Sequence, residues 1–187
     1  MEFDAVVLAG GGARRLGGLD KAAIEVGGVS LLDRAIDAVW AAREVIIVGP
    51  PRATSVSVRW TSESPPGGGP LRATIAGLEL VGCDVVVVLA VDYPFVTRDV
   101  VAGLIRAIGR HEGAALQDES GAMHYVVGAY RTDALRSALE AHPPVEASMR
   151  SLFGTLDLAV VRADRAALDV DTPEDLESAC AADSDVD

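Results

Sequence analysis

A run of seven apolar residues, Val85 to Val91, limits the possible folds of this chain more than any other feature. A strand is apolar on both sides of its pleat only when both of its faces are covered, and such strands occupy the centre of parallel sheets. The run is also far too short to cross a membrane. It therefore predicts the central strand of an α/β sheet.

Segments with strand-like and helix-like patterns alternate along the rest of the sequence. The strand-like segments are residues 5–8, 44–48, 56–60, 124–130 and 157–161. The helix-like segments are residues 31–42, 71–80, 98–110 and 134–141, and Thr172 with Pro173 begins a last helix. This alternation predicts a three-layer α/β sandwich with a mostly parallel sheet. The length of 187 residues suits a single domain. We expect that domain to span residues 1–180, followed by a disordered tail over 181–187.

The composition restricts the classes of partner. The formal net charge is −12, so the chain repels nucleic acids and anionic membranes, and we expect neither as a partner. The acidic N-terminus does not resemble a secretory signal. The two cysteines, Cys83 and Cys180, lie far apart and lack a metal-binding spacing, which favours the cytoplasm. Any phosphate-bearing ligand must then be held by a local cluster of donors.

A glycine-rich segment after the first expected strand offers such a cluster. It reads L-A-G-G-G-A-R-R-L-G-G-L-D-K from Leu8 to Lys21. Glycines 10–12 let backbone N–H groups face an anion without interference from a Cβ atom, and Arg15 and Lys21 add positive charge. The segment is not a P-loop, and Arg15 stands where a dinucleotide fingerprint needs its third glycine. A solvated glycine turn is the alternative interpretation, which Arg and Lys in this order make less favourable.

Two further segments place carboxylates where they could hold a metal ion. Asp92, in D-Y-P-F, ends the central strand, where a carboxylate faces the ligand crevice and can hold Mg²⁺ beside phosphates. Taken alone, a turn or cap residue before Pro94 is the favoured interpretation, and the glycine-rich segment reverses that preference. Asp171, in D-V-D-T-P-E-D-L, is either part of a well-capped helix start or a second metal ligand. Asp169 is the substitute for that second role.

The glycine-rich segment resembles the signature L-A-G-G-x-x-x-R-M-G-x-x-K of the GT-A-like nucleotidyltransferases. It has one extra residue before the lysine, and Leu16 replaces the usual Met. Its ending, G-G-x-D-K, is similar to that of the molybdenum cofactor guanylyltransferases, the MobA-like family. The D-x-P-F motif and the T-P-E-D-L element match this family in type and order, so the resemblance extends from Val6 to Leu176. It implies a single-domain Rossmann-like (GT-A-like) fold and a Mg²⁺-dependent nucleotidyltransferase.

The resemblance also implies roles for individual residues. Arg15, Lys21 and Asp92 would be catalytic, with Arg15 on the β- and γ-phosphates and Lys21 on the α-phosphate. Asp92 and Asp171 would hold Mg²⁺. The nucleotide would be bound by Leu8, Ala9, Gly10, Gly11, Gly12, Lys21, Glu63, Gly69 and Pro70.

Some positions depart from the family pattern near the loop that flanks the base and ribose. That loop corresponds to Ser64–Pro70, and Glu63 is the nearest candidate for the carboxylate that commonly precedes it. Arg72 follows Leu71 where the family often has a small residue, and an asparagine of some members is replaced by Val48 or Gly49. These departures leave the base preference open.

The acceptor side is matched by two residues only. His124 stands where the family often has His-Pro, and Arg150 lies in a segment resembling S-x-R-x-L, although a lone His or Arg is more often structural. The family resemblance implies GTP as donor and molybdopterin as acceptor, giving molybdopterin guanine dinucleotide and pyrophosphate, with transient contacts to other cofactor-biosynthesis proteins.

Three alternatives remain. One is a CTP-dependent molybdopterin cytidylyltransferase, and another is a nucleotidyltransferase for a sugar phosphate or other phosphorylated metabolite. The third is a non-catalytic nucleotide-binding regulatory domain, against which the presence of Arg15, Lys21 and Asp92 argues.

Overall fold

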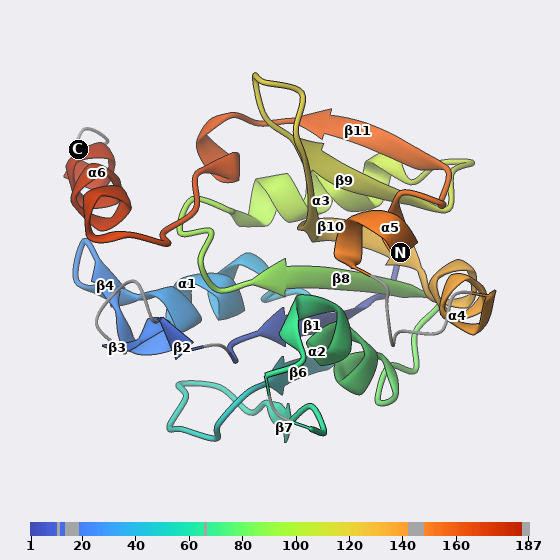
Figure 1. The fold of residues 1–187 in the computed structure, drawn as a ribbon, viewed down its shortest axis with the longest axis horizontal. Helices are drawn as coiled ribbons and strands as arrows, with labels where there is room; N and C mark the ends of the chain where they lie inside the picture. The colour runs from blue at the N-terminus through green and yellow to red at the C-terminus, as the bar shows by residue number, and fades with distance from the viewer. Residues whose placement is uncertain (11, 14–18, 66, 142–147, 185–187) are drawn as a thin grey trace.

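A seven-stranded sheet forms the centre of the molecule in the computed structural model (Figure 1). The structure describes residues 1–187 except 11, 14–18, 66, 142–147 and 185–187. The sheet has the order β11-β9-β10-β8-β1-β6-β7. Its strands are β1 (Asp4–Leu8), β6 (Val45–Val48), β7 (Arg59–Thr61), β8 (Val85–Ala90), β9 (Gly113–Gln117), β10 (Met123–Arg131) and β11 (Leu158–Arg162). Within this sheet β10 runs antiparallel to both of its neighbours, and the other pairs are parallel. The expected α/β fold with a mostly parallel sheet is confirmed.

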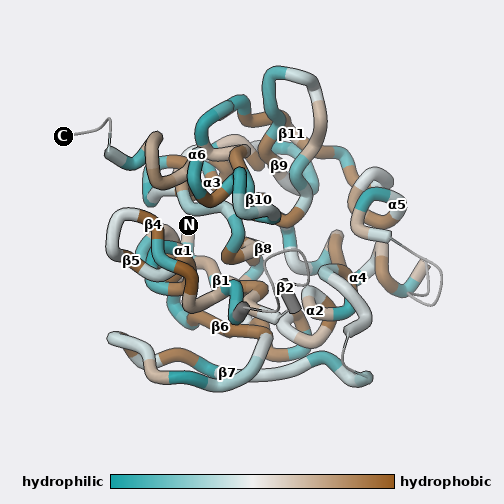
Figure 2. Tube along the Cα trace, turned by 60° about the vertical axis from the view of Figure 1, so that its left-hand side comes forward, coloured by the Kyte–Doolittle hydropathy of each residue, from teal (hydrophilic) through white to brown (hydrophobic). Residues whose placement is uncertain are grey.

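Helices cover both faces of the sheet. Side chains that alternate along β8 enter two separate cores, as expected for a strand buried on both sides. One core joins the sheet to α1 (Leu31–Ala38), α3 (Arg98–Ala107) and α6 (Pro173–Ser184). The other joins it to α2 (Gly69–Leu78), α4 (Thr132–Ala141) and α5 (Met149–Phe153). The apolar colouring of β1, β6 and β8 in Figure 2 follows this interior.

Helix α2 packs very closely on the sheet at Gly77. A Cβ atom at this glycine would lie 2.3 Å from Val6 Cγ1, so only glycine fits without movement. This contact, near the end of α2, helps to hold the helix against β1 and β6.

Two short hairpins complete the N-terminal part of the fold. Strands β2 (Gly12–Ala13) and β3 (Leu19–Asp20) pair with each other, as do β4 (Glu25–Val26) and β5 (Val29–Ser30). The first hairpin leads directly into the 3₁₀ turn η2 (Lys21–Ala23), and a second 3₁₀ turn, η3 (Arg165–Ala167), precedes α6.

Several element boundaries differ from those predicted. The helix expected over 31–42 ends at Ala38, and the strand expected over 56–60 is β7 at 59–61. Strand β9 and helix α5 were not predicted. Helix α6 continues to Ser184, so residues 181–184, expected in a disordered tail, are helical. Asp183 ties this end to the fold through an ion pair of 2.9 Å with Arg34.

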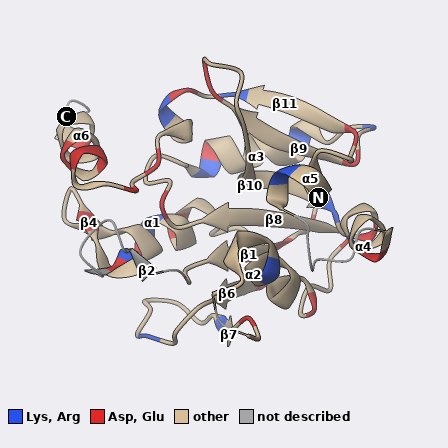
Figure 3. Cartoon of the chain, viewed as in Figure 1, with Lys and Arg blue, Asp and Glu red and all other residues tan. Residues whose placement is uncertain are grey.

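Acidic residues of α6 are coloured red in Figure 3, in keeping with the net charge of −12. Among the described residues no helix has the length and apolar content needed to cross a bilayer.

Candidate active site

The candidate site lies where β8, β1, β6 and β7 end on the same edge of the sheet. Backbone contacts continue just past the strands: Val91 N–H donates to the Leu8 carbonyl (3.1 Å), and Ala9 N–H donates to the Val48 carbonyl (2.9 Å). The chain segments that follow these strands therefore stay side by side. Ligands of open α/β sheets bind outside this carboxyl edge.

Lys21 bridges two carboxylates at this edge. Its Nζ atom lies 3.0 Å from Asp92 Oδ2 and also pairs with Asp171 Oδ1. The side chains of Lys21 and Asp92 are 16% and 23% exposed, so the contact is largely shielded from solvent. Lys21 is the only lysine of the chain. The structure thus brings three of the sequence-predicted site residues together.

Local structure explains how Lys21 reaches this place. Gly12 pairs with Asp20 in the β2–β3 hairpin, which positions the residue after Asp20 beside the start of the glycine-rich segment. Gly10 lies exposed just past β1. Gly11, Arg14 and Arg15 lie outside the described residues, so the expected phosphate contacts of Gly11 and Arg15 stay predictions.

Asp171 arrives from the far end of the sequence through a backbone contact. Val170 N–H donates to the Asp92 carbonyl oxygen (2.9 Å), which places the next residue beside Asp92. Asp175 Oδ2 accepts from the N–H groups of Asp171 (3.1 Å) and Thr172 (2.8 Å), and Thr172 Oγ1 accepts from Asp175 N–H (3.2 Å). The segment therefore starts a capped helix and also delivers a carboxylate to Lys21, so its two interpretations are compatible.

The charges at the site influence one another. Burial of the Lys21 ammonium disfavours its charged form. The negative charges and hydrogen bonds of Asp92 and Asp171 outweigh this effect and raise the pKa of Lys21. Desolvation, together with the charges of Asp171 and Asp92, raises the pKa of Asp169. Asp169 is therefore close enough to both carboxylates for their charges to affect it. The ion pairs of Lys21, however, are with Asp92 and Asp171. Of the two aspartates considered from the sequence, Asp171 is the one that meets Lys21.

The carboxylates at the site suit a magnesium ion. Asp92 Oδ1 is buried and has no hydrogen-bond partner among the described residues, an arrangement that normally costs free energy. No set of three His, Cys, Asp or Glu side chains in the described ranges is arranged to hold a metal ion. Mg²⁺ is commonly bound by one or two carboxylates, with water and substrate phosphates as its other ligands. Asp92 and Asp171 fit that pattern.

The residues expected around the base and ribose lie after β7 and at the start of α2. Glu63 Oε1 accepts from the Gly67 N–H (2.8 Å), so one carboxylate oxygen already closes the loop. Glu63 Oε2 is buried with no partner in the described part of the chain. Gly69 and Pro70 form the first turn of α2. The structure therefore gives Glu63 a loop-closing contact and leaves its other oxygen available.

Both acceptor candidates line one pocket of about 530 Å³ next to this site. His124 and Arg150 share its wall with Pro70, at the start of α2, and with Tyr93, which directly follows Asp92. Sequence reasoning missed Tyr93, which occupies the unspecified position of the D-x-P-F motif, and Asp118, which contacts His124 (3.1 Å). The only sequence signal at Asp118 is the D-E-S-G pattern, which is typical of a turn.

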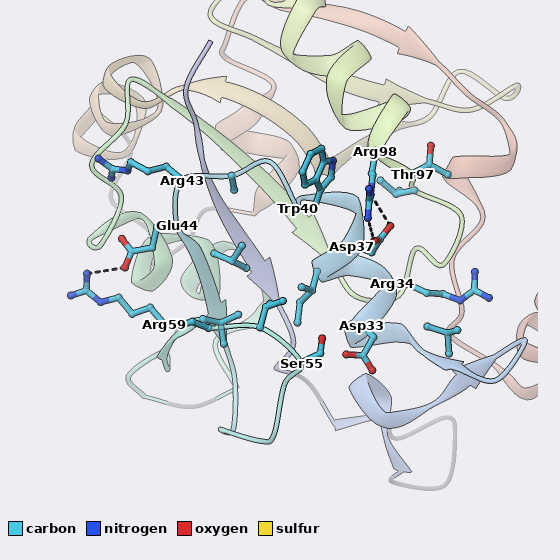
Figure 4. Close-up of a pocket in the computed structure, with 18 of the residues that line it drawn as sticks. Asp33, Arg34, Asp37, Trp40, Arg43, Glu44, Ser55, Arg59, Thr97 and Arg98 are labelled. Carbon is cyan, nitrogen blue, oxygen red and sulfur yellow. Dashed lines mark hydrogen bonds and ion pairs between the residues drawn. The ribbon is translucent and has the colours of Figure 1, made fainter.

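A larger cavity, of about 1250 Å³, lies elsewhere, beside α1 and the residues before β7 (Figure 4). None of the sequence-predicted site residues lines it. Arg98 pairs with Asp37 and lies 4.8 Å from the centre of the Trp40 ring, and Arg59 pairs with Glu44 at 3.5 Å. These charges neutralise one another, so we do not assign the active site to this cavity.

Comparison with known proteins shows the family of the chain and agrees with its fold. Residues 5–181 match the family model described as MobA-like NTP transferase domain. A molybdenum cofactor guanylyltransferase of Mesorhizobium japonicum is 33% identical over 147 residues, which cover 72% of this chain and 71% of that protein.

Solved structures show the same fold at low identity. Molybdopterin-guanine dinucleotide biosynthesis protein A from Archaeoglobus fulgidus superposes with a TM-score of 0.78 at 17% identity, covering 98% of this chain and 100% of that one. The 2-C-methyl-D-erythritol 4-phosphate cytidylyltransferase of Thermus thermophilus gives 0.74 at 24% identity, covering 97% and 98%.

Proposed function

The chain belongs to the MobA-like NTP transferase family, and from that membership we propose that this nucleotidyltransferase moves GMP from GTP to molybdopterin. The products would be molybdopterin guanine dinucleotide and pyrophosphate. The observation that carries the proposal is the meeting of Lys21 with Asp92 and Asp171 at the carboxyl edge of the sheet. The guanylyltransferase of Mesorhizobium japonicum supports the choice of donor and acceptor.

The proposed reaction is a displacement at the α-phosphorus of GTP. An oxygen of the acceptor phosphate forms a bond to the α-phosphorus, and the bond from the α-phosphorus to the bridging oxygen of pyrophosphate breaks. A phosphate is already an oxyanion at neutral pH, so no side chain has to remove a proton from the nucleophile. Catalysis then depends on positioning and on neutralising charge.

Lys21 supplies a positive charge for the transferred phosphoryl group. Asp92 and Asp171 hold its ammonium in the structure, and on substrate binding it would exchange carboxylate oxygens for oxygens of the α-phosphate. Mg²⁺ held by Asp92 and Asp171 would, when bound, neutralise phosphate charge and orient the triphosphate. Arg15 and glycines 10–12 would contact the β- and γ-phosphates, as the sequence predicts.

The acceptor would occupy the 530 Å³ pocket beside this centre. Arg150 in its wall offers a positive charge to an anionic acceptor. Both cysteines are free thiols, which supports a reducing, cytoplasmic setting for the reaction.

Replacement of Lys21 tests the proposed role. We expect Lys21→Ala to lower kcat for pyrophosphate release from GTP and molybdopterin by about 10²–10³, the effect of losing one transition-state donor. Arg98→Ala is the matched control, because Arg98 pairs with Asp37 beside the other cavity. Normal turnover by Lys21→Ala would contradict the assignment.

A CTP-dependent reaction is the second candidate, favoured by the fold shared with the Thermus thermophilus cytidylyltransferase. Pyrophosphate release measured with GTP and with CTP, each with molybdopterin or a sugar phosphate, separates these possibilities. Nucleotide binding without release under any of these conditions would instead identify a regulatory domain.

A further inference from the structure

Three side chains form a hydrogen-bonded chain at the acceptor pocket. Tyr93 Oη lies 3.1 Å from His124 Nδ1, and His124 Nε2 lies 3.1 Å from Asp118 Oδ2. Asp118 is fixed in turn by the Ser120 hydroxyl (2.7 Å) and the Ala122 N–H (2.9 Å). Tyr93 and His124 line the pocket, whereas Asp118 contacts His124 from outside the lining. We call these three residues the relay.

The position of each proton in the relay follows from Asp118. Hydrogen bonds from Ser120 and His124, with one from Ala122 N–H, lower the pKa of Asp118 to about 2. Asp118 is therefore a carboxylate at neutral pH and only accepts hydrogen bonds. The Nε2 atom of His124 must therefore donate to Asp118. When this is the single proton of the ring, Nδ1 has none, and it accepts a hydrogen bond from the Tyr93 hydroxyl. The Tyr93 oxygen keeps its lone pairs for a ligand.

The sequence builds a local irregularity in β10 that holds the relay in place. The pairing of β9 with β10 shifts between His124 and Gly128, as in a β-bulge. The buried Tyr130 donates its hydroxyl to the Tyr125 carbonyl within this bulge (2.7 Å). A Cβ atom at residue 128 would lie 2.3 Å from Tyr130 Oη, so glycine is needed there. The bulge is therefore specified by side chains and fixes where His124 stands.

The relay also lies next to the proposed chemistry. Tyr93 follows Asp92 in the sequence, and Asp92 Oδ2 is 3.0 Å from Lys21 Nζ. A ligand group that contacts the Tyr93 oxygen is thus held close to the residues that would receive the α-phosphate. Arg150 in the same pocket wall supplies the complementary site for an anionic group.

We propose that Tyr93 binds the acceptor directly and that His124 and Asp118 position its hydroxyl. The pocket would then select an acceptor that combines an N–H or O–H donor, for the Tyr93 oxygen, with a phosphate or similar anion, for Arg150. This inference rests on the proposed function, since it assumes that the pocket holds the acceptor of nucleotide transfer.

Steady-state kinetics with GTP and molybdopterin test the proposal. Tyr93→Phe is expected to raise KM for molybdopterin about tenfold, the effect of losing one hydrogen bond to substrate, and to leave KM for GTP within about twofold. Asp118→Asn should raise the same KM about threefold, because it no longer fixes the proton on Nε2. In a Tyr93→Phe background, Asp118→Asn should add nothing, since its effect passes through the missing hydroxyl.

The chain provides a matched control for Asp118→Asn. His111 Nδ1 and Asp157 Oδ2 form a second histidine–aspartate pair at 3.0 Å, and neither residue lines the acceptor pocket. Asp157→Asn should leave both KM values unchanged. Tyr93→Phe would overturn the proposal if it changed the KM values for GTP and molybdopterin equally. The proposal would also fail if the double variant raised KM for molybdopterin by the product of the two single effects.

Two further measurements do not depend on turnover. Long-range ¹H–¹⁵N NMR spectra of the ligand-free protein at pH 8.5 should place the His124 proton on Nε2, and a proton on Nδ1 would overturn the relay. Pterin fluorescence reports molybdopterin binding without nucleotide, and equal affinities of wild type and Tyr93→Phe would overturn the binding role. Failure of the proposed function is recognised separately, as wild-type enzyme that transfers neither GMP nor CMP to molybdopterin.

Discussion

Lys21 contacts two aspartates that lie 71 and 150 residues away along the chain. Fifteen of the 16 basic residues are arginines, so a lysine occurs at this one place. An ammonium is a compact point charge, whereas a guanidinium is planar and suited to paired contacts with one carboxylate. A lysine can therefore sit between Asp92 and Asp171 and still move to a phosphate oxygen.

The position of Lys21 predicts competition with a divalent cation. Lys21→Met leaves Asp92 and Asp171 without their shared cation, so we expect the nucleotide-free variant to bind Mn²⁺ at least about tenfold more tightly. Electron paramagnetic resonance of Mn²⁺ measures this directly. Arg52→Met removes the same charge from the neighbouring Asp20 pair and should change Mn²⁺ affinity little. Unchanged or weaker Mn²⁺ binding by Lys21→Met would show that the ammonium does not occupy the metal position.

At the residue scale, the sequence predicted residues that meet in the candidate site, Lys21, Asp92 and Asp171, but not most of their contacts. Asp92 could be placed because a carboxylate at the end of a buried strand has a defined position in an α/β sheet. The choice between Asp169 and Asp171 depends on the backbone contact of Val170 with Asp92, which no pattern encodes. Tyr93 and His124 are 31 residues apart, and only the antiparallel strand β10 brings them together.

Among the elements, strong patterns were predicted well and weak ones were missed. Strand β8 was predicted because a short, wholly apolar run rich in valine suits a buried strand far better than a helix. Strand β9 reads Gly-Ala-Ala-Leu-Gln, which has little intrinsic preference for a strand, and its pairing with β10 and β11 creates it. Helix α5 was missed although Ser148 and Ser151 form a capping box at its start, because the segment was interpreted only as an arginine motif.

Two helical glycines predict opposite effects of the same substitution. Glycine in a helix costs roughly 0.8–1.0 kcal/mol relative to alanine. Gly103→Ala in α3 meets only Arg106, 3.9 Å away, and should stabilise the protein by up to about that amount. Gly77→Ala in α2 would place Cβ 2.3 Å from Val6 Cγ1, and we expect a net loss of roughly 1–2 kcal/mol once overpacking is included.

Urea unfolding of both variants and wild type measures these changes. Both substitutions gain the same helix propensity from replacing glycine with alanine. The difference between their changes in the free energy of unfolding therefore isolates the packing of α2 on β1. If Gly77→Ala stabilises the protein as much as Gly103→Ala, the close contact at residue 77 is wrong.

The whole molecule carries a net charge of −12 and must bind a nucleoside triphosphate of the same sign. Salt screens such repulsion over a distance of about 10 Å at 0.1 M. We therefore expect the association rate of a fluorescent GTP, without added Mg²⁺, to rise about two- to threefold between roughly 20 and 200 mM KCl. Stopped-flow fluorescence measures the rate, and the uncharged guanosine analogue should show no such change. A rate that falls with salt would indicate that local positive charge, not the overall charge, governs the approach of the nucleotide.

The contact between Lys21 and Asp171 has a consequence for synthesis of the protein. The ribosome produces Lys21 early, but its second carboxylate partner emerges only after residue 171 has been added. A nascent chain or an N-terminal fragment that stops earlier lacks one of the two carboxylates that contact Lys21. On the proposed function, we expect unfinished chains that end before Asp171 not to consume nucleotide, and activity to appear only after translation has passed that point.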